Sequence, residues 1–176
     1  MKVLAFAASN SRNSINKALI HYAATRLTGS DVEIIDINDY DMPIYSSDLE
    51  EELGIPEAAS AFLDKISQAD ALLISYAEHN GNYTVAYKNL FDWASRKNRE
   101  VYQGKPITML ATSPGPGGAR SVLSLAKDSA HFFAGNVVAT LSVPEFFKNF
   151  DQEKNRLNNP DLSKQLDAAL ARLTEK

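Results

Sequence analysis

Cysteine is absent from this chain of 176 residues. Its absence excludes a disulfide scaffold, a Cys-x-x-Cys redox centre, a thiol nucleophile and a metal site with cysteine ligands. Any oxidation or reduction by this protein must therefore use a bound cofactor. We expect no metal ion at its site.

Strong charge and long apolar runs are also lacking. The net charge is −4, and no block of basic residues interleaved with aromatic ones occurs, so we expect neither nucleic acid nor a membrane surface as a partner. No apolar run approaches the length that spans a membrane, and the N-terminus leads into a strand without a signal-peptide pattern. We therefore expect one cytoplasmic domain over residues 1–176.

Two familiar phosphate-binding fingerprints are missing, namely G-x-G-x-x-G and the Walker sequence G-x-x-x-x-G-K-[ST]. In their place, a loop rich in hydroxyl and amide side chains joins a predicted strand, Val3–Ala8, to a helix that begins at Ile15. Backbone N–H groups, hydroxyls and the dipole at a helix N-terminus can bind an anion with little formal positive charge. Such a loop suits a phosphate monoester such as that of FMN.

Each polar residue of this first loop has a functional and a structural interpretation. The hydroxyls of Ser9, Ser11 and Ser14 and the amide of Asn16 can bind the phosphate, and Arg12 offers a planar guanidinium. Alternatively, Ser14 is a plain helix N-cap, while Arg12 and Asn16 are solvated.

Apolar runs alternate with amphipathic segments along the chain. The predicted strands are Val3–Ala8, Val32–Ile37, Ala71–Ser75, Pro106–Ala111 and Val137–Leu141; the predicted helices are Ile15–Leu27, Pro56–Ser67, one through Trp93 and Arg96, Arg120–Phe133 and Asp161–Leu173. This alternation predicts a flavodoxin-like, doubly wound α/β sandwich with a parallel five-stranded sheet in the order 2-1-3-4-5. Loops 9–14, 78–83 and 113–118 would then surround one crevice at the carboxyl ends of the strands.

The second loop follows the most apolar strand. Backbone N–H groups there can hydrogen-bond the pyrimidine edge of a flavin and stabilise the charge that gathers on it during reduction. The Asn80-Gly81 pair usually indicates a hairpin, but its place between a strand and a helix makes a hairpin less expected. His79 is either a flavin contact or an exposed loop residue. The residues assigned to cofactor binding in this loop are Ala77, Glu78, His79, Asn80 and Gly81.

The third loop is rich in glycine and proline. Glycine allows close approach of the backbone to a flat ligand, and proline restricts the loop. We interpret it as a wall beside the flavin rather than a seat for a second phosphate with Arg120 as counter-ion; a rigid surface turn is the structural alternative. The residues assigned to cofactor binding are Ser113, Pro114, Gly115 and Gly117.

Three motifs together resemble those of the NADPH-dependent FMN reductase family, which includes quinone, chromate and azo-dye reductases. They are Ser9-x-x-Arg12-x-Ser14-x-Asn16, the pair Glu78-x-Asn80-Gly81 and Tyr87–Arg96, and the run Ser113–Arg120. The resemblance implies bound FMN, NADPH or NADH as hydride donor, and a homodimer or homotetramer with the Lys88–Arg96 helix in the contact region. Ala77 stands where the family usually has proline, and His79 where it usually has tyrosine.

The expected activity is a ping-pong transfer of a hydride from the nicotinamide to FMN and then to a small acceptor: a quinone, flavin, azo or nitro compound, or metal oxyanion. We assign no catalytic acid or base, because the cofactor carries this chemistry. Tyr45 is a candidate for the acceptor pocket. The alternatives are a flavodoxin-type electron carrier and a non-catalytic binding module that retains the fold.

Overall fold

The computed structural model describes residues 1–175 and has a parallel five-stranded sheet in the order β2-β1-β3-β4-β5. The strands are β1 (Lys2–Ala8), β2 (Asp31–Ile34), β3 (Ala71–Tyr76), β4 (Pro106–Thr112) and β5 (Asn136–Val143). This order confirms the flavodoxin-like fold expected from the sequence. The central strand β3 is buried along its whole length, as its continuous apolar run predicted.

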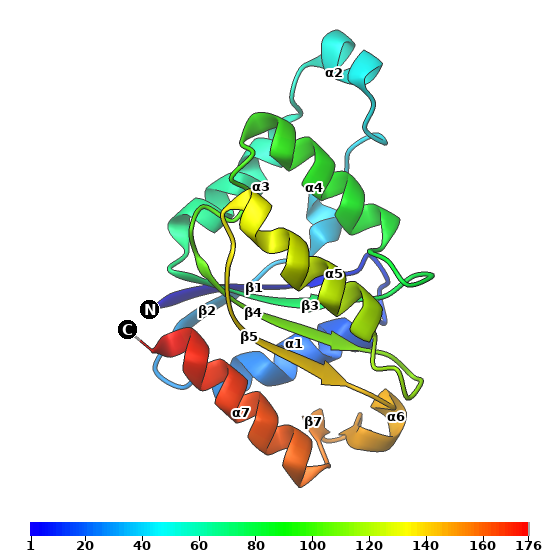
Figure 1. Ribbon diagram of the computed structural model, residues 1–176, viewed down its shortest axis with the longest axis vertical. Coiled ribbons are helices and arrows are strands. Elements are labelled where there is room, and N and C mark those ends of the chain that lie inside the picture. Colours follow the sequence, from blue (N-terminus) through cyan, green and yellow to red (C-terminus); the bar gives the residue numbers. More distant parts are fainter. Residues whose placement is uncertain (176) are drawn as a thin grey trace.

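Helices cover both faces of the sheet (Figure 1). Helices α3 (Glu57–Gln68), α4 (Val85–Lys97) and α5 (Arg120–Ala130) lie on one face, and α1 (Ile15–Arg26) and α7 (Pro160–Thr174) lie on the other. Two separate apolar clusters fill the layers, one containing Phe62 and Trp93 and the other containing Leu19 and Leu166. Strand residues alternate between the two clusters, because successive side chains of a strand point to opposite faces.

Three predicted boundaries were wrong. Strand β2 ends at Ile34, and Ile37–Tyr40 form a 3-10 helix, η1, because the Asp36 side chain accepts the Asn38 N–H and caps it. Helix α5 ends at Ala130 and continues only as the 3-10 turn η2 (His131–Phe133). Strand β5 extends to Val143.

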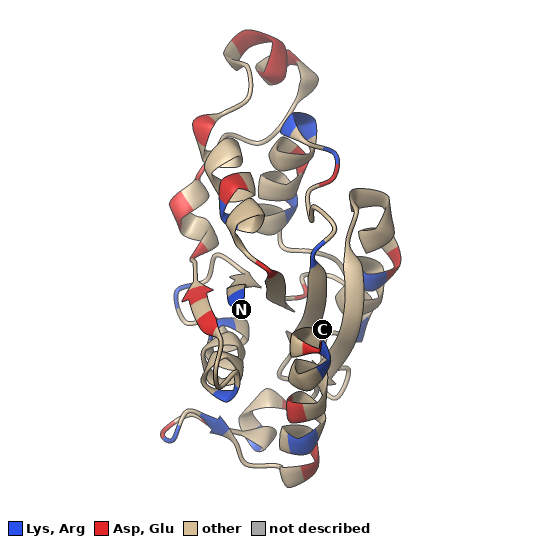
Figure 2. Ribbon diagram, turned by 90° about the vertical axis from the view of Figure 1, so that its left-hand side faces the viewer, with Lys and Arg blue, Asp and Glu red and all other residues tan. Residues whose placement is uncertain are grey.

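Short elements also occur where the sequence analysis had only loops. Helix α2 (Ser47–Leu53) projects from the rest of the molecule, and its acidic residues gather at the top of Figure 2. Helix α6 (Phe146–Asn149) and the small antiparallel pair β6 (Phe150–Asp151) and β7 (Arg156–Leu157) lie between β5 and α7. No helix within residues 1–175 has the length and apolarity needed to cross a membrane.

Candidate functional site

The three polar loops emerge from neighbouring strands at their carboxyl ends, and hydrogen bonds tie the segments around them together. The Thr84 hydroxyl, at the end of the second loop, donates to the Ala8 carbonyl at 3.1 Å. The Glu78 carboxylate accepts the backbone N–H of Val122, just after the third loop, at 2.9 Å. The three loops therefore converge at one end of the sheet, as predicted, because the carboxyl ends of parallel strands lie on the same side.

The first loop leaves several hydrogen-bond donors unused. Ser11 and Arg12 are exposed, and within residues 1–175 the Arg12 guanidinium has no hydrogen bond or ion pair. Among the same residues, the backbone N–H groups of Ile15 and Asn16 have no acceptor, since they begin helix α1. The Ser14 side chain accepts the Lys17 N–H at 3.4 Å, so Ser14 does act as an N-cap. Unused N–H groups beside a free arginine are suited to an anion.

Asn16 has a different role from the one expected of its amide. Its side chain is buried: Oδ1 accepts the Ser75 hydroxyl at 2.7 Å and the Thr112 N–H at 3.2 Å, and Nδ2 donates to the Thr112 carbonyl at 3.2 Å. The amide therefore joins α1 to the ends of β3 and β4, and only the Asn16 backbone remains for a ligand. Ser9 is also buried, and its hydroxyl oxygen accepts the Ser11 N–H within the loop.

The second loop forms a tight turn of the hairpin type, which the sequence analysis considered less expected at this place. Asn80 and Gly81 both have left-handed φ values, 52° and 76°. His79 and Asn82 exchange backbone hydrogen bonds of 2.9 and 3.1 Å across them. The Asn-Gly pair thus produces its usual hairpin turn even between a strand and a helix. The turn uses the N–H groups of His79 and Asn82, which leaves fewer donors for a ligand than the sequence suggested.

Buried tyrosines pack behind the second loop. The Tyr102 hydroxyl lies 3.0 Å from that of Tyr87 and 3.5 Å from that of Tyr76, which immediately precedes Ala77. Burial raises the pKa of Tyr102 to about 12 and the pKa values of Tyr76 and Tyr87 well above their ordinary range. The three phenols stay neutral near pH 7 and form a rigid support for the loop.

The third loop is fixed by backbone contacts with the chain that follows β5. The carbonyl of Gly115 accepts the Glu145 N–H at 2.9 Å, and that of Ser113 accepts the Phe146 N–H at 3.0 Å. Arg120 donates to the carbonyls of Pro116 and Gly117, so it closes its own loop and is not the free counter-ion of the second-phosphate interpretation. A Cβ added at Gly115 or Gly117 would meet no atom within 4 Å, so the Cα of each glycine faces open space on that side.

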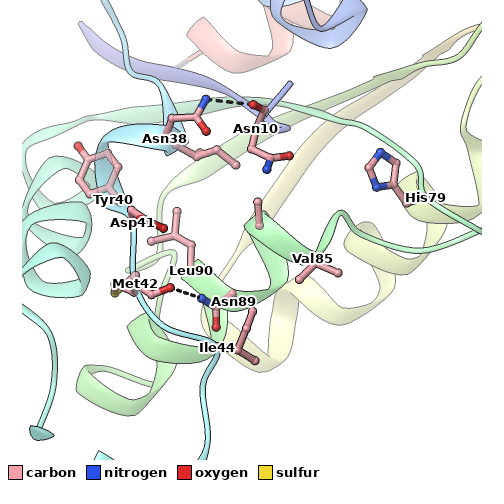
Figure 3. A pocket seen from close by; sticks show the side chains of 12 residues that line it. Asn10, Asn38, Tyr40, Asp41, Met42, Ile44, His79, Val85, Asn89 and Leu90 are labelled. Carbon is pink, nitrogen blue, oxygen red and sulfur yellow. Dashed lines mark hydrogen bonds between the residues drawn. The ribbon is translucent and has the colours of Figure 1, made fainter. Parts of the chain in front are cut away.

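A pocket of about 600 Å³ adjoins the first two loops (Figure 3). It lies between η1, the segment after η1 and the start of α4. Its lining residues are Asn10, Ile37, Asn38, Tyr40, Asp41, Met42, Ile44, His79, Val85, Ala86, Asn89 and Leu90. Asp41 is the one charged side chain among them, and His79 is exposed at the edge next to the second loop.

Most residues of this pocket were missed by the sequence analysis, which had named Tyr45 as a candidate for an acceptor pocket. Tyr45 does not line it; its ring stands edge-on to Trp93, with centroids 5.0 Å apart. Thr84, which does not line the pocket but joins the second loop to the first, had a signal in the sequence: it precedes a helix, and its hydroxyl accepts the Tyr87 N–H as an N-cap. Asn10 and Asn38 had no such signal, because no local pattern shows which amides meet across a fold. Asn89 belongs to the motif Tyr87–Arg96, but the motif does not show which side chain lines a pocket.

Comparison with known proteins gives a family match over most of the chain. The model of a family described as NADPH-dependent FMN reductase matches residues 1–148. A 2-hydroxy-1,4-benzoquinone reductase from Burkholderia sp is 31% identical, over 88% of this chain and 81% of the relative. An NAD(P)H:quinone oxidoreductase from Solanum tuberosum is 30% identical, over 90% of this chain and 80% of the relative.

Solved structures agree on the fold. A flavoenzyme NAD(P)H:(acceptor) oxidoreductase from Paracoccus denitrificans superposes with a TM-score of 0.76 at 23% identity, covering 98% of this chain and 94% of that chain. An NAD(P)H:quinone oxidoreductase from Methanothermobacter marburgensis superposes with a TM-score of 0.70 at 17% identity, covering 100% of this chain and 97% of that chain.

Proposed function

The chain belongs to the NADPH-dependent FMN reductase family, and from this membership we propose that it is an FMN-dependent NAD(P)H oxidoreductase that reduces quinones and similar small acceptors. The observation that carries the proposal is the first loop. It brings to one point the unused N–H groups at the start of α1, the exposed hydroxyl of Ser11, and Arg12, whose guanidinium has no partner within residues 1–175. Two further loops lie at the same edge of the sheet.

The donors of this loop fit the phosphate of FMN. We propose that Ser11, Arg12 and Ser14 hold it together with the backbone N–H groups of Ile15 and Asn16. An arginine fork and helix N-terminal N–H groups are the donors that phosphate oxygens accept best. Ser9 and the side chain of Asn16 shape the loop from inside.

The flavin ring would then lie against the second and third loops. We propose that the backbone of Ala77–Gly81 contacts its edge and that Ser113, Pro114, Gly115 and Gly117 form a wall beside it. When bound, FMN supplies the hydride chemistry. The protein residues position the partners, and no side chain is proposed as an acid or base.

We propose that the pocket of about 600 Å³ receives the acceptor, because it borders the first loop at Asn10 and the second at His79. Its mixed lining of amide and apolar groups suits a ring with carbonyl oxygens, which needs a few hydrogen-bond donors on largely apolar walls. Asp41 would disfavour anionic acceptors.

The test is a visible spectrum of the protein loaded with FMN, followed by anaerobic addition of NADPH and, separately, NADH. Bleaching of bound flavin, and its reversal by 1,4-naphthoquinone, is the expected result. Bound flavin that bleaches only with dithionite would favour a flavodoxin-type carrier. A protein that binds no flavin would be a non-catalytic module.

Replacing Arg12 by alanine is expected to weaken FMN binding about 10- to 100-fold, since a charge-assisted hydrogen bond contributes about 1.5–3 kcal/mol. Fluorescence titration of the apoprotein with FMN measures this directly. Arg99→Ala is the matched control, because Arg99 is exposed and precedes β4 at the opposite edge of the sheet. Equal affinities of the Arg12 and Arg99 variants would remove Arg12 from the phosphate site.

We also propose a cytoplasmic homodimer or homotetramer. Ile44 and Val85, which flank the pocket, are 65% and 67% exposed, and large apolar side chains in such a position favour an interface. Light scattering that gave the monomer mass would contradict this assignment.

A further inference from the structure

We propose that one face of α4 is a latch that holds segment 42–45 in place as a wall of the pocket, and that Asn89 and Trp93 are therefore positioning residues for the acceptor. The role of these residues toward an acceptor rests on the proposed function. The latch itself rests on contacts that require no cofactor. In Figure 3, Asn89 reaches from α4 to the carbonyl of Met42 across the lower edge of the pocket.

The segment has no regular structure of its own to support it. Met42 and Ile44 line the pocket, and the chain here runs between η1 and α2. Within residues 1–175, no backbone-to-backbone hydrogen bond involves residues 42–45. Polar groups of such a segment need other partners, so its path depends on the side chains that bind it.

Asn89 supplies the inner half of the latch. Its Oδ1 accepts the Tyr45 N–H at 2.8 Å, and its Nδ2 donates to the carbonyls of Met42 and Pro43, both at 3.1 Å. One amide therefore binds both ends of the segment. The same contacts leave Asn89 no unused donor for a ligand, so its effect on an acceptor must come through the wall.

Trp93, one turn further along α4, supplies the second half. Its Nε1 donates to the Pro43 carbonyl at 2.8 Å, and its ring packs edge-on against that of Tyr45. The indole is fully buried, whereas Pro43 is exposed, so the donor side of this hydrogen bond is shielded from water. Spacing of four residues places Asn89 and Trp93 on the same face of the helix.

A third contact extends the latch toward α2. The Tyr45 hydroxyl donates to Glu50 Oε2 at 2.8 Å, and Arg96 Nε donates to the same oxygen at 2.8 Å. The hydrogen bonds from Tyr45 and Arg96 lower the pKa of Glu50. This cluster is exposed to solvent, so we assign the positioning effect to Asn89 and Trp93.

Two variants test the latch, with a matched control. Trp93→Phe keeps an aromatic ring but removes the indole N–H, and Asn89→Ala removes the whole amide. Thr108→Val is the control, because it also deletes one buried hydrogen bond, from Thr108 Oγ1 to the Ala169 carbonyl, but in the opposite helix layer. Each protein is loaded with FMN, and hydrogen exchange of segment 42–45, NADPH-dependent flavin reduction and the KM for 1,4-naphthoquinone are measured.

We expect faster exchange of segment 42–45 in both latch variants and no change in Thr108→Val. The KM for 1,4-naphthoquinone should rise about fivefold in Trp93→Phe, the equivalent of one lost hydrogen bond, and more in Asn89→Ala. Flavin reduction by NADPH without acceptor should stay at the wild-type rate in Trp93→Phe and Thr108→Val. A loss confined to the acceptor step separates positioning from general destabilisation.

Three results would overturn parts of this scheme separately. Unchanged exchange of segment 42–45 in both variants would disprove the latch, with or without flavin. Faster exchange with an unchanged KM would disprove its role toward the acceptor. Failure of NADPH to reduce the flavin bound to the wild-type protein would instead refute the proposed oxidoreductase activity. The hydrogen-exchange data would still show whether the latch holds segment 42–45.

Discussion

Replacing Asn16 by alanine is expected to lower the free energy of unfolding by about 3–5 kcal/mol, because each orphaned buried donor or acceptor costs about 1–3 kcal/mol. The amide is 2% exposed, and its removal would strand the Ser75 hydroxyl and both backbone groups of Thr112. Urea unfolding followed by circular dichroism measures the change.

The consequence of this variant extends to the site. Asn16 joins the start of α1 to the ends of β3 and β4, which lead into the second and third loops, so FMN affinity should also fall. Asn13→Ala is the matched control, because Asn13 is an exposed amide in the same loop with no hydrogen bond among the described residues. A loss of less than about 1 kcal/mol in Asn16→Ala, within the range of ordinary surface substitutions, would show that the strand ends do not depend on it.

Replacing Gly118 by alanine is also expected to lower the free energy of unfolding substantially. A Cβ at this position would overlap Ser142 Oγ and lie 3.0 Å from the backbone nitrogen of Pro144, and Gly118 has a φ of +60°. Ser142 Oγ also donates to the Gly118 carbonyl at 2.7 Å, so a shift that makes room for the Cβ would disturb this hydrogen bond. Strain in the left-handed region and overpacking together should cost about 2–4 kcal/mol.

Gly117→Ala provides the comparison for Gly118. It is the neighbouring residue, its φ lies outside the left-handed region, and nothing stands within 4 Å of its Cβ position. Thermal unfolding should therefore separate the two variants clearly, with Gly117→Ala close to wild type. Similar melting temperatures for both would show that the third loop is not held against the chain after β5.

Much of the fold was predictable because its signals are local. Strand β3 is a continuous apolar run, and α7 carries leucines at helical spacing, so both elements were expected near their observed positions. One of the errors falls where a polar side chain ends an element. Asp36 caps η1 and ends the region where β2 was expected to continue, and an apolar pattern alone does not contain that capping contact.

The site was only partly predictable for a related reason. The unused donors of the first loop follow from a hydroxyl-rich sequence at a helix start, which is local. The sequence analysis did not foresee that the Asn16 amide binds Ser75 and Thr112, because these partners lie 59 and 96 residues away in sequence. The Asn80-Gly81 turn shows the opposite case: its local preference prevailed, although its place between strand and helix argued against it.

The sequence by itself determined the alternation of strands and helices, the three polar loops and the family motifs, since periodicity and turn chemistry act between residues close in the chain. Only the tertiary structure decided that the amides of Asn16 and Asn89 bind other parts of the protein. It also decided that α4 holds segment 42–45 against the pocket, because Asn89 and Trp93 find their partners more than 40 residues away. A hydrogen bond depends on positions in space, which are known only after the whole chain has packed.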